Sequence, residues 1–481
     1  MQAPAETALR PLEKALLIGI GSLIGFGWLA AFFLQYINSD AGYFLSLAER
    51  LAQGSQLYVD YHSAYPPLAI WGWTLVASLG GGTAAYGVYL GSQLLVVAAC
   101  IYVFFRLTRW STDQVLYRWI ASLLFAASLL LWEGSLIMLE PWMLLGGLGA
   151  LYLVIARPSS SPAWWLGGIC LGLAFLAKQY AVLWWPPLLW WAWSVSRQKA
   201  GLMLLGMLSP LILLNLYHWL SIGDPWMAYR QWMVATDYLG QGGNPDFRTG
   251  IKWLIYLVPV LIIAFRYRRQ AEFSREKLLL LILLCCAMVP AFFRSYPHYY
   301  MPALAFLWLW GVSMFPVKPK SMATLLLGIV VLFTAYQGGK WGKALWKNRE
   351  LRAWQYAQAA WLGESLPPDS KVLLLTAYQG WNFLGKFDPI FPESVGYNFP
   401  ENFSEAVLTE HLRQAPCVVM DAQTYLRYPS IGKLLIRHHF QMIRQQETGL
   451  EIWCKPQSVE KTGQNLTLPF AHRNEKGLIT K

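Results

Sequence analysis

The chain has 481 residues, of which 56% are hydrophobic and only 13% charged, and its formal net charge is +12. Soluble domains have about 25% charged residues, so this composition excludes a soluble enzyme, a disordered chain and a small disulfide-rich scaffold. Charge is sparse over residues 1–339, with 21 Lys/Arg and 13 Asp/Glu, and denser over residues 340–481, with 17 and 13. We therefore expect a polytopic α-helical membrane domain over 1–339 and a water-soluble domain over 340–481.

Apolar runs of spanning or near-spanning length follow one another through the first domain. They begin near Ala15, Ala84, Leu116, Ile137, Ala163, Gln179, Gly201, Gly250, Lys277, Tyr299 and Met322. These runs predict about eleven transmembrane helices, the first of them an uncleaved helix rather than a removed leader. The apolar stretch 67–80 is shorter, and it predicts a re-entrant or juxtamembrane segment.

Basic residues are concentrated in alternate connections between these runs. The richer set contains Arg10, Lys14, Arg106, Arg109, Arg118, Arg157, Arg197, Lys199, Arg266, Arg268, Arg269, Arg275, Lys277, Lys318 and Lys320. Short loops rich in Lys and Arg face the cytoplasm, so we expect a multi-pass protein of the inner (plasma) membrane with a cytoplasmic N-terminus and an extracytoplasmic tail. The same placement excludes nucleic acid as the reason for the positive charge.

The external loop 38–66 contains an amphipathic pattern that ends at Gly54 and predicts a short helix on the membrane surface. Its expected apolar face consists of Tyr43, Leu47, Ala48 and Leu51. In the tail, the runs KVLLLTAY and CVVMDA follow a helical segment and predict a small α/β domain. Cys417 and Cys454 lie in this tail; they can pair if it is outside the cytoplasm, although spacing alone does not establish that they do.

Ionisable residues gather on the expected external side. The carboxylates are Asp40, Glu49, Asp60, Glu133, Glu140, Asp224, Asp237 and Asp246, and the cationic or titratable residues are Lys178, Arg230, Arg248, Arg294 and His298, with His62 as a further candidate. Such groups at the ends of membrane helices are candidates for function, because leaving them in hydrocarbon is costly. A carboxylate that takes a proton beside cations that stabilise a departing phosphate suits chemistry on an anionic substrate.

Asp40 directly follows the first apolar run, in the string Asn38-Ser39-Asp40-Ala41-Gly42-Tyr43. Taken alone, it is best interpreted as the cap of the surface helix, since Asn, Ser and Asp are favoured caps. The strings Leu57-Tyr58-Val59-Asp60 and Tyr65-Pro66-Pro67-Leu68 then follow in order. This pattern resembles the first external loop of the GT-C glycosyltransferases, in particular bacterial members similar to protein O-mannosyltransferases and the lipid A aminoarabinose transferase.

Three later strings extend the resemblance over most of residues 15–340. They are Leu139-Glu140-Pro141-Trp142, the run from Gly168 to Lys178-Gln179, and Pro297-His298-Tyr299-Tyr300-Met301-Pro302. The resemblance implies a polyprenyl-phosphate sugar as donor, a lipid, glycan or protein acceptor, and an inverting single displacement at the membrane surface. It implies that Asp40 is the general base and Glu140 a second acid that orients the acceptor, binds a sugar hydroxyl or assists a metal.

The remaining roles are assigned to residues on the same side. Lys178, Arg294 and His298 are expected to stabilise the leaving phosphate, Asp60 is a third acid, and Tyr43 and Tyr65 are expected to pack on a sugar or isoprenoid. The cations and tyrosines have structural alternatives: a snorkelling lysine, a flanking arginine, a hydrated interfacial histidine and interfacial tyrosines. Arg230 and Arg248 are interpreted as solvated loop charges.

The resemblance also bears on a metal: Ala41 stands where many family members have a second acid, which removes a metal ligand. We therefore assign no metal ligands and no cofactor, and a divalent cation stays as the disfavoured alternative.

Three other functions remain open. The strongest is a transporter or flippase of lipid-linked sugars, but the sequence has no internal repeat, and its ionisable residues lie at one face rather than at mid-membrane. An O-antigen ligase or polymerase would lack an Asp loop immediately after the first helix. A scaffold without catalytic activity would have no need to keep Asp40, Glu140 and Lys178 together.

Overall fold

The computed structural model divides into two compact units, Met1–Gln355 and Tyr356–Lys481. The expected boundary at 339–340 and this division both lie within one long helix, α14 (Ser321–Ser365). The structure describes residues 11–61, 63–79, 86–232, 247–267, 274–293, 296–314, 321–366, 371–375, 388–389, 405–421, 424, 430–446 and 449–456.

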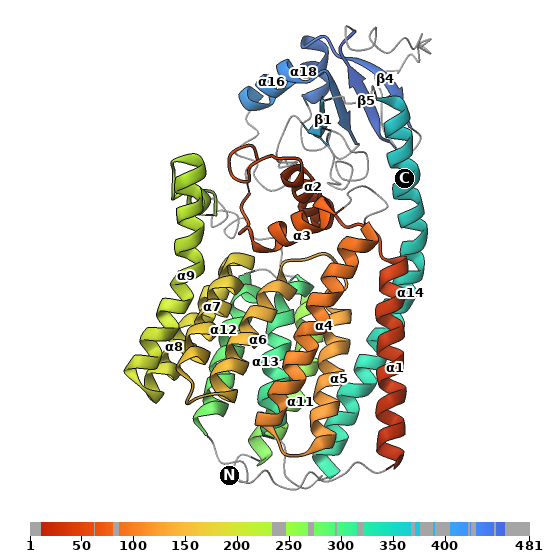
Figure 1. Ribbon diagram of the computed structural model, residues 1–481. Helices are drawn as coiled ribbons and strands as arrows, with labels where there is room; N and C mark the ends of the chain where they lie inside the picture. The colour runs from red at the N-terminus through yellow and green to blue at the C-terminus, as the bar shows by residue number, and fades with distance from the viewer. Residues whose placement is uncertain are drawn as a thin grey trace. The chain divides into compact units, whose positions relative to one another are not determined.

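Each predicted apolar run falls on a helix of the first unit (Figure 1). Besides α14, these helices are α1 (Pro11–Leu34), α4 (Tyr86–Ser111), α5 (Val115–Leu131), α6 (Glu140–Ala156), α7 (Ser161–Ala177), α8 (Trp185–Val195), α9 (Arg197–Ile222), α11 (Phe247–Tyr267), α12 (Arg275–Phe293) and α13 (Pro297–Ser313). Within the described residues, α1, α4, α9, α11 and α12 are long and apolar enough to cross a membrane. Helix α8 has 11 residues, which is short of the about 20 that span a bilayer, so the count of eleven spans stays a prediction.

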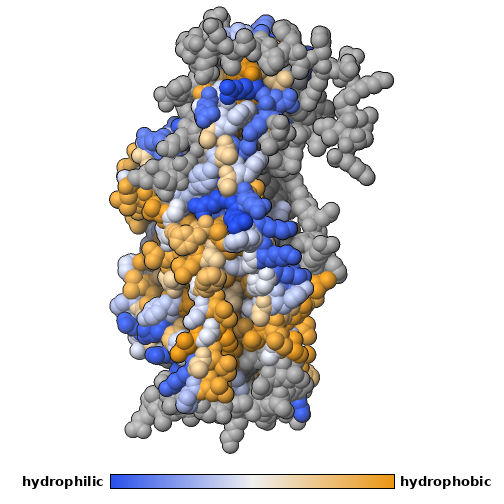
Figure 2. Space-filling model, turned by 90° about the vertical axis from the view of Figure 1, so that its right-hand side faces the viewer, coloured by the Kyte–Doolittle hydropathy of each residue, from blue (hydrophilic) through white to orange (hydrophobic). Residues whose placement is uncertain are grey.

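On the face shown in Figure 2, apolar side chains cover much of the surface of this helical unit. On α1, Leu12, Leu23 and Phe26 are 72%, 73% and 71% exposed. Soluble proteins rarely expose contiguous apolar surface of this extent, whereas lipid solvates it without cost. The exposed belt and the apolar helices together indicate a membrane protein.

Close packing of α7 against α9 explains the glycines before Lys178. A side chain at Gly168 would collide with the backbone of Met203, and one at Gly206 with the backbone of Trp165. In lipid, the hydrophobic effect does not drive helices together, and small residues let them associate by close backbone packing. These glycines therefore fix α7 in the bundle, and with it the position of Lys178 at the end of α7.

The loop after α1 folds into two short helices, α2 (Ser39–Ala52) and α3 (Leu68–Ser78). The amphipathic helix is thus confirmed, with Leu47 and Ala48 of its predicted face buried. It ends before Gly54, whose φ of 100° is a conformation that favours glycine. Phe44 of α2 packs against Trp73 of α3 with ring centroids 5.6 Å apart, which joins the two helices.

The second unit contains a five-stranded sheet in the order β2-β1-β3-β5-β4. The strands are β1 (Lys371–Leu375), β2 (Asp388–Pro389), β3 (Cys417–Met420), β4 (Gln441–Gln445) and β5 (Glu451–Cys454). Strands β2, β1 and β3 pair in parallel, and β5 is antiparallel to β3 and β4. Leu412 of α16 (Glu405–Gln414) and Leu435 of α18 (Ile431–Arg437) are buried in one cluster with Val418 of β3. A disulfide joins Cys417 and Cys454 on the paired strands.

Candidate active site

Asn38, rather than Asp40, caps the surface helix. Its side-chain oxygen accepts a hydrogen bond from the Ala41 amide at 2.9 Å, and α2 begins at Ser39. Asp40 therefore lies in the first turn of α2 instead of at its cap, and the capping interpretation is wrong. The carboxylate is left for another role, in a position where the positive end of the helix dipole favours a negative charge.

The connection that leads into α2 is held by α14. The side chain of Gln355 accepts from the Ile37 amide at 3.2 Å and donates to the Ile37 carbonyl at 2.8 Å. Arg352 donates to the Phe33 carbonyl at 2.6 Å. These bonds satisfy backbone groups that α1 and α2 leave open between them. Helix α14 thus holds the backbone that leads to Asp40 at two points.

Asp40 is exposed, but protein atoms surround its carboxyl group closely. The resulting loss of bulk water raises the pKa of Asp40 above its ordinary value, while the positive charges of His298 and Lys178 oppose the rise. Glu140 and Glu133 also raise the pKa of Asp40, because they are nearby like charges. An accessible carboxylate with a raised pKa is a stronger base than an ordinary aspartate.

Lys178 and Glu140 form a buried ion pair beside Asp40. The Lys178 amino group lies 3.3 Å from Glu140 Oε1, and the two side chains are only 9% and 1% exposed. Lys178 also lies over the rings of Tyr65, at 4.7 Å, and Tyr299, at 5.9 Å. The snorkelling interpretation of Lys178 is therefore wrong. Ring faces stabilise the ammonium group without occupying its N–H donors. Lys178 therefore keeps N–H donors for a ligand in addition to the one directed at Glu140.

Buried hydrogen bonds hold the start of α6, and so hold Glu140. Gln93 of α4 donates to the Met138 carbonyl at 3.1 Å and accepts from Trp142 Nε1 at 3.0 Å. Tyr180 donates to Glu140 Oε1 at 3.4 Å. The second oxygen, Oε2, is buried and receives no hydrogen bond from another described residue. A buried carboxylate oxygen without a donor is rare, and a ligand hydroxyl would satisfy it.

His298 pairs with Glu133, with Nδ1 at 2.8 Å from Oε2. His298 lies in the first turn of α13 and is 12% exposed at its side chain, so the hydrated interfacial interpretation is wrong. Glu133 has a φ of 71°, which is uncommon for a residue other than glycine. Such backbone positions persist only where the surroundings enforce them, and they concentrate at functional sites.

The structure brings together some of the other predicted residues. The rings of Tyr43 and Tyr65 lie 6.2 Å apart, which places Tyr43 against the ring that Lys178 covers. Asp60 is exposed and accepts from the Gln56 amide at 2.7 Å, a contact local to its own turn. Arg294 lies outside the described residues, as do His62, Asp237, Asp246 and the side chain of Arg248.

No protein-family model and no curated protein matches the sequence. Among solved structures, ArnT from Cupriavidus metallidurans bound to undecaprenyl phosphate superposes with a TM-score of 0.63 at 12% identity, over 91% of this chain and 98% of that one. The Archaeoglobus fulgidus oligosaccharyltransferase tethered with an acceptor peptide superposes with a TM-score of 0.53 at 11% identity, over 91% of this chain and 74% of that one. The chain has the GT-C fold. The resemblance inferred from the loop motifs is confirmed at this level.

On this fold, Asp40 has no second acid directly after it in the chain. Ala41 is fully buried and supplies no ligand where a second acid would stand. Among the described residues, no group of three or more His, Cys, Asp or Glu side chains is arranged to hold an ion. Lys178 and His298 are instead the cations that the structure places near the acids.

Two partners in the candidate site were not assigned from the sequence. Glu133 was recognised only as one external carboxylate among several, and its pairing with His298 spans 165 residues. Tyr180 follows Lys178 by two positions and contacts the same carboxylate, Glu140. The Ala-Lys-Gln-Tyr string was the available signal for Tyr180, whereas no local pattern links Glu133 to His298.

Proposed function

We propose that the protein is an integral membrane glycosyltransferase that moves a sugar from a polyprenyl-phosphate donor to a lipid, glycan or protein acceptor. One observation carries this proposal: Asp40 is accessible, does not serve as the cap of α2, and lies beside the Lys178–Glu140 and His298–Glu133 pairs. The fold supports it, because one structural neighbour is bound to undecaprenyl phosphate and another, AglB, is in complex with a dolichol-phosphate.

The proposed reaction is a single displacement with inversion. Asp40 takes the proton of the acceptor hydroxyl as that oxygen attacks the anomeric carbon. The bond from the anomeric carbon to the phosphate oxygen breaks, and its electron pair leaves with the polyprenyl phosphate. Lys178 and His298 supply hydrogen-bond donors and positive charge where negative charge accumulates on the phosphate. Arg294 is proposed as a third donor.

Glu140 and the tyrosines are proposed to hold the substrates. Glu140 Oε2, which receives no hydrogen bond from another described residue, accepts one from a hydroxyl of the sugar or acceptor. Tyr43 and Tyr65 present ring faces beside Lys178, and a sugar or the first isoprene unit packs against them. Asp60 is proposed only as a weaker third acid, because its carboxylate is exposed and bonded within its own turn.

We also propose that the reaction takes place outside the cytoplasm, in the inner or plasma membrane. The excess of basic residues in alternate loops supports this orientation. The Cys417–Cys454 disulfide supports an extracytoplasmic second unit, since the cytosol keeps most thiols reduced.

The deciding experiment uses purified protein in nanodiscs with polyprenyl-phosphate hexoses and a lipid extract. Mass spectrometry measures release of polyprenyl phosphate by the wild type and by Asp40→Asn. Release by the wild type alone supports a transferase that uses Asp40. If no donor is cleaved and lipid-linked sugars cross the bilayer instead, the protein is a flippase and the proposal fails.

Chelation is expected to leave the activity nearly unchanged, because Ala41 removes the acid that would bind a divalent ion. The measurement compares initial rates of polyprenyl phosphate release before and after dialysis against EDTA. A loss of activity that Mg²⁺ or Mn²⁺ restores would show that a metal is required after all.

The pH profile is expected to report the titration of Asp40. Because the base must be deprotonated, kcat/KM should fall as the pH falls through the raised pKa of Asp40, at a higher pH than for an ordinary aspartate. His298→Gln removes a positive charge that lowers the pKa of Asp40, so the acid limb should move to still higher pH. The matched control is His439→Gln, an exposed histidine of the second unit. An acid limb that does not move in His298→Gln contradicts the electrostatic coupling.

A further inference from the structure

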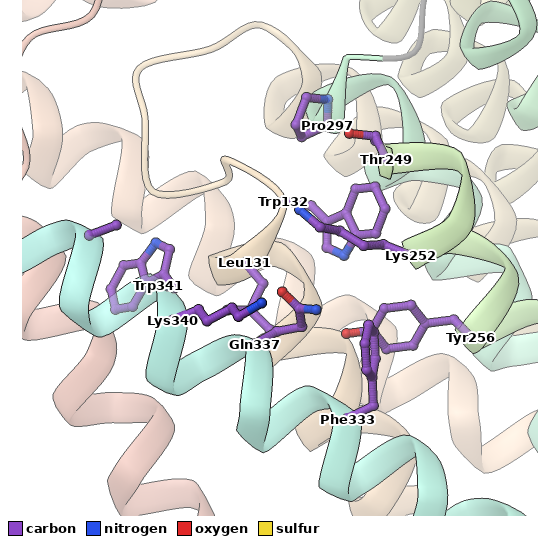
Figure 3. Close-up of a pocket in the computed structure, with 11 residues that line it drawn as sticks. Leu131, Trp132, Thr249, Lys252, Tyr256, Pro297, Phe333, Gln337, Lys340 and Trp341 are labelled. Atoms are coloured by element: carbon purple, nitrogen blue, oxygen red, sulfur yellow. The ribbon is translucent and has the colours of Figure 1, made fainter. Parts of the chain in front are cut away.

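A hollow lies in the first unit, between α11 and α14, and its lining includes none of Asp40, Glu140, Lys178 and His298. Its volume is about 290 Å³, near the roughly 300 Å³ at which small-ligand pockets begin. Figure 3 shows its lining. The residues that matter for the argument are Trp132, Lys252, Tyr256, Gln337, Lys340 and Trp341. We call this hollow the α11–α14 pocket.

Two lysines face each other across this pocket. Lys252 reaches in from α11 and Lys340 from α14, and both side chains point toward its middle (Figure 3). Neither forms an ion pair with a carboxylate in the described part of the chain, and Lys340 lies over the ring of Tyr336, at 4.5 Å. Gln337 adds an amide between them. Two ammonium groups that converge on one space, with no carboxylate partner among the described residues, attract an anion.

The depth of the pocket indicates what carries that anion. Leu131 ends α5 and Pro297 begins α13, and both line the pocket. Thr249, which also lines it, is the first residue of the candidate span Thr249–Arg266. The pocket therefore lies where apolar helices reach the membrane surface. Trp132, Tyr256, Phe333 and Trp341 supply the aromatic side chains that are enriched at this level.

We propose that the α11–α14 pocket binds the phosphate-bearing headgroup of a membrane lipid other than the sugar donor, with Lys252 and Lys340 as its cationic contacts. Phosphate is the anion that lipids present at this depth, and basic pockets between membrane helices bind such headgroups. The aromatic walls contact the glycerol or sugar part of the headgroup.

The pocket shares two chain segments with the proposed active site. Trp132 precedes Glu133, and Pro297 precedes His298, so the pocket wall continues directly into the Glu133–His298 pair. A lipid held here is either the sugar acceptor, anchored by its phosphate, or a bystander lipid that stabilises this wall. The acceptor alternative rests on the proposed function, whereas binding of a lipid phosphate does not.

Native mass spectrometry of delipidated protein tests the binding without any reaction. The probes are dioleoyl phosphatidic acid, which has a phosphate monoester, and dioleoyl phosphatidylcholine, whose headgroup has no net charge. The wild type is expected to retain one phosphatidic acid in preference to phosphatidylcholine. In the double variant Lys252→Gln/Lys340→Gln, the affinity for phosphatidic acid should fall roughly 30-fold, because each lysine near a membrane surface contributes about 1 kcal/mol of binding free energy.

Two further variants control for charge and folding. Lys343→Gln/Lys347→Gln removes two exposed charges from α14 outside the pocket and should bind as the wild type does. Lys252→Arg/Lys340→Arg keeps both charges and should retain most of the affinity. The proposal is overturned if the wild type does not prefer phosphatidic acid, or if the glutamine variant of the pocket binds as tightly as its control.

Kinetics in phosphatidylcholine nanodiscs then distinguish an acceptor lipid from a bystander lipid in the pocket. An acceptor site predicts that the pocket variant raises the acceptor KM and leaves the donor KM unchanged. A bystander site predicts lost phosphatidic acid binding with both KM values unchanged. An increase in the donor KM alone would assign the pocket to the donor and overturn the proposal of a second lipid. If no sugar transfer is found with any donor, the proposed function fails, but the binding result still decides the pocket.

Discussion

Asp40→Asn is expected to lower the rate of sugar transfer by about 10²- to 10⁴-fold, the usual contribution of a general base, and to leave the melting temperature nearly unchanged. Asparagine keeps the shape of the side chain but cannot take the acceptor proton. Stability should persist because Asn38 caps α2, so the helix loses no cap when Asp40 changes. Rates of polyprenyl phosphate release and thermal unfolding in detergent measure the two quantities.

Two neighbouring variants separate catalysis from structure. Asp60→Asn makes the same chemical change in the same loop, and it should retain most activity because that carboxylate is exposed and bonded to the Gln56 amide. Asn38→Ala removes the actual cap and should cost about 1 kcal/mol of stability. If Asp40→Asn instead unfolds the protein early and its folded fraction still transfers sugar, Asp40 is structural.

The ends of the helices were predictable from the sequence because hydrophobic length and loop charge both mark them. Asp40, Glu140, Lys178 and His298 each stand at such an end, and the alternation of basic loops assigned all four to one side. The structure places them together, since the charges of Glu140, Lys178 and His298 all act on the carboxyl group of Asp40. The sidedness of ionisable residues therefore included these four, but it also included Asp60, which the structure leaves bonded within its own turn.

The partners within the cluster were not predictable from the sequence. Three favoured capping residues stand in a row at Asn38, Ser39 and Asp40, so composition could not select Asn38. Whether an acid at a helix end meets Lys178 or His298 depends on how the helices pack, which periodicity does not specify. The same holds for the α11–α14 pocket, whose two lysines lie 88 positions apart.

Lys178→Met is expected to destabilise the protein by about 3–5 kcal/mol as well as to impair transfer, because it leaves Glu140 as a buried charge without its partner. Glu140→Gln leaves Lys178 in the same condition and should have a comparable effect. The double variant Lys178→Met/Glu140→Gln removes both charges and should recover most of the lost stability. Thermal unfolding of the four proteins in one detergent measures this cycle.

Activity is expected to follow a different course from stability in these four proteins. If Lys178 stabilises the leaving phosphate and Glu140 binds a hydroxyl, the double variant should be stable but should transfer sugar no faster than either single variant. The donor KM should rise more than the acceptor KM in Lys178→Met, because the lost cation faces the phosphate. Should the double variant regain activity along with stability, the ion pair serves only the packing of α6 against α7, and the phosphate must be bound by other cations.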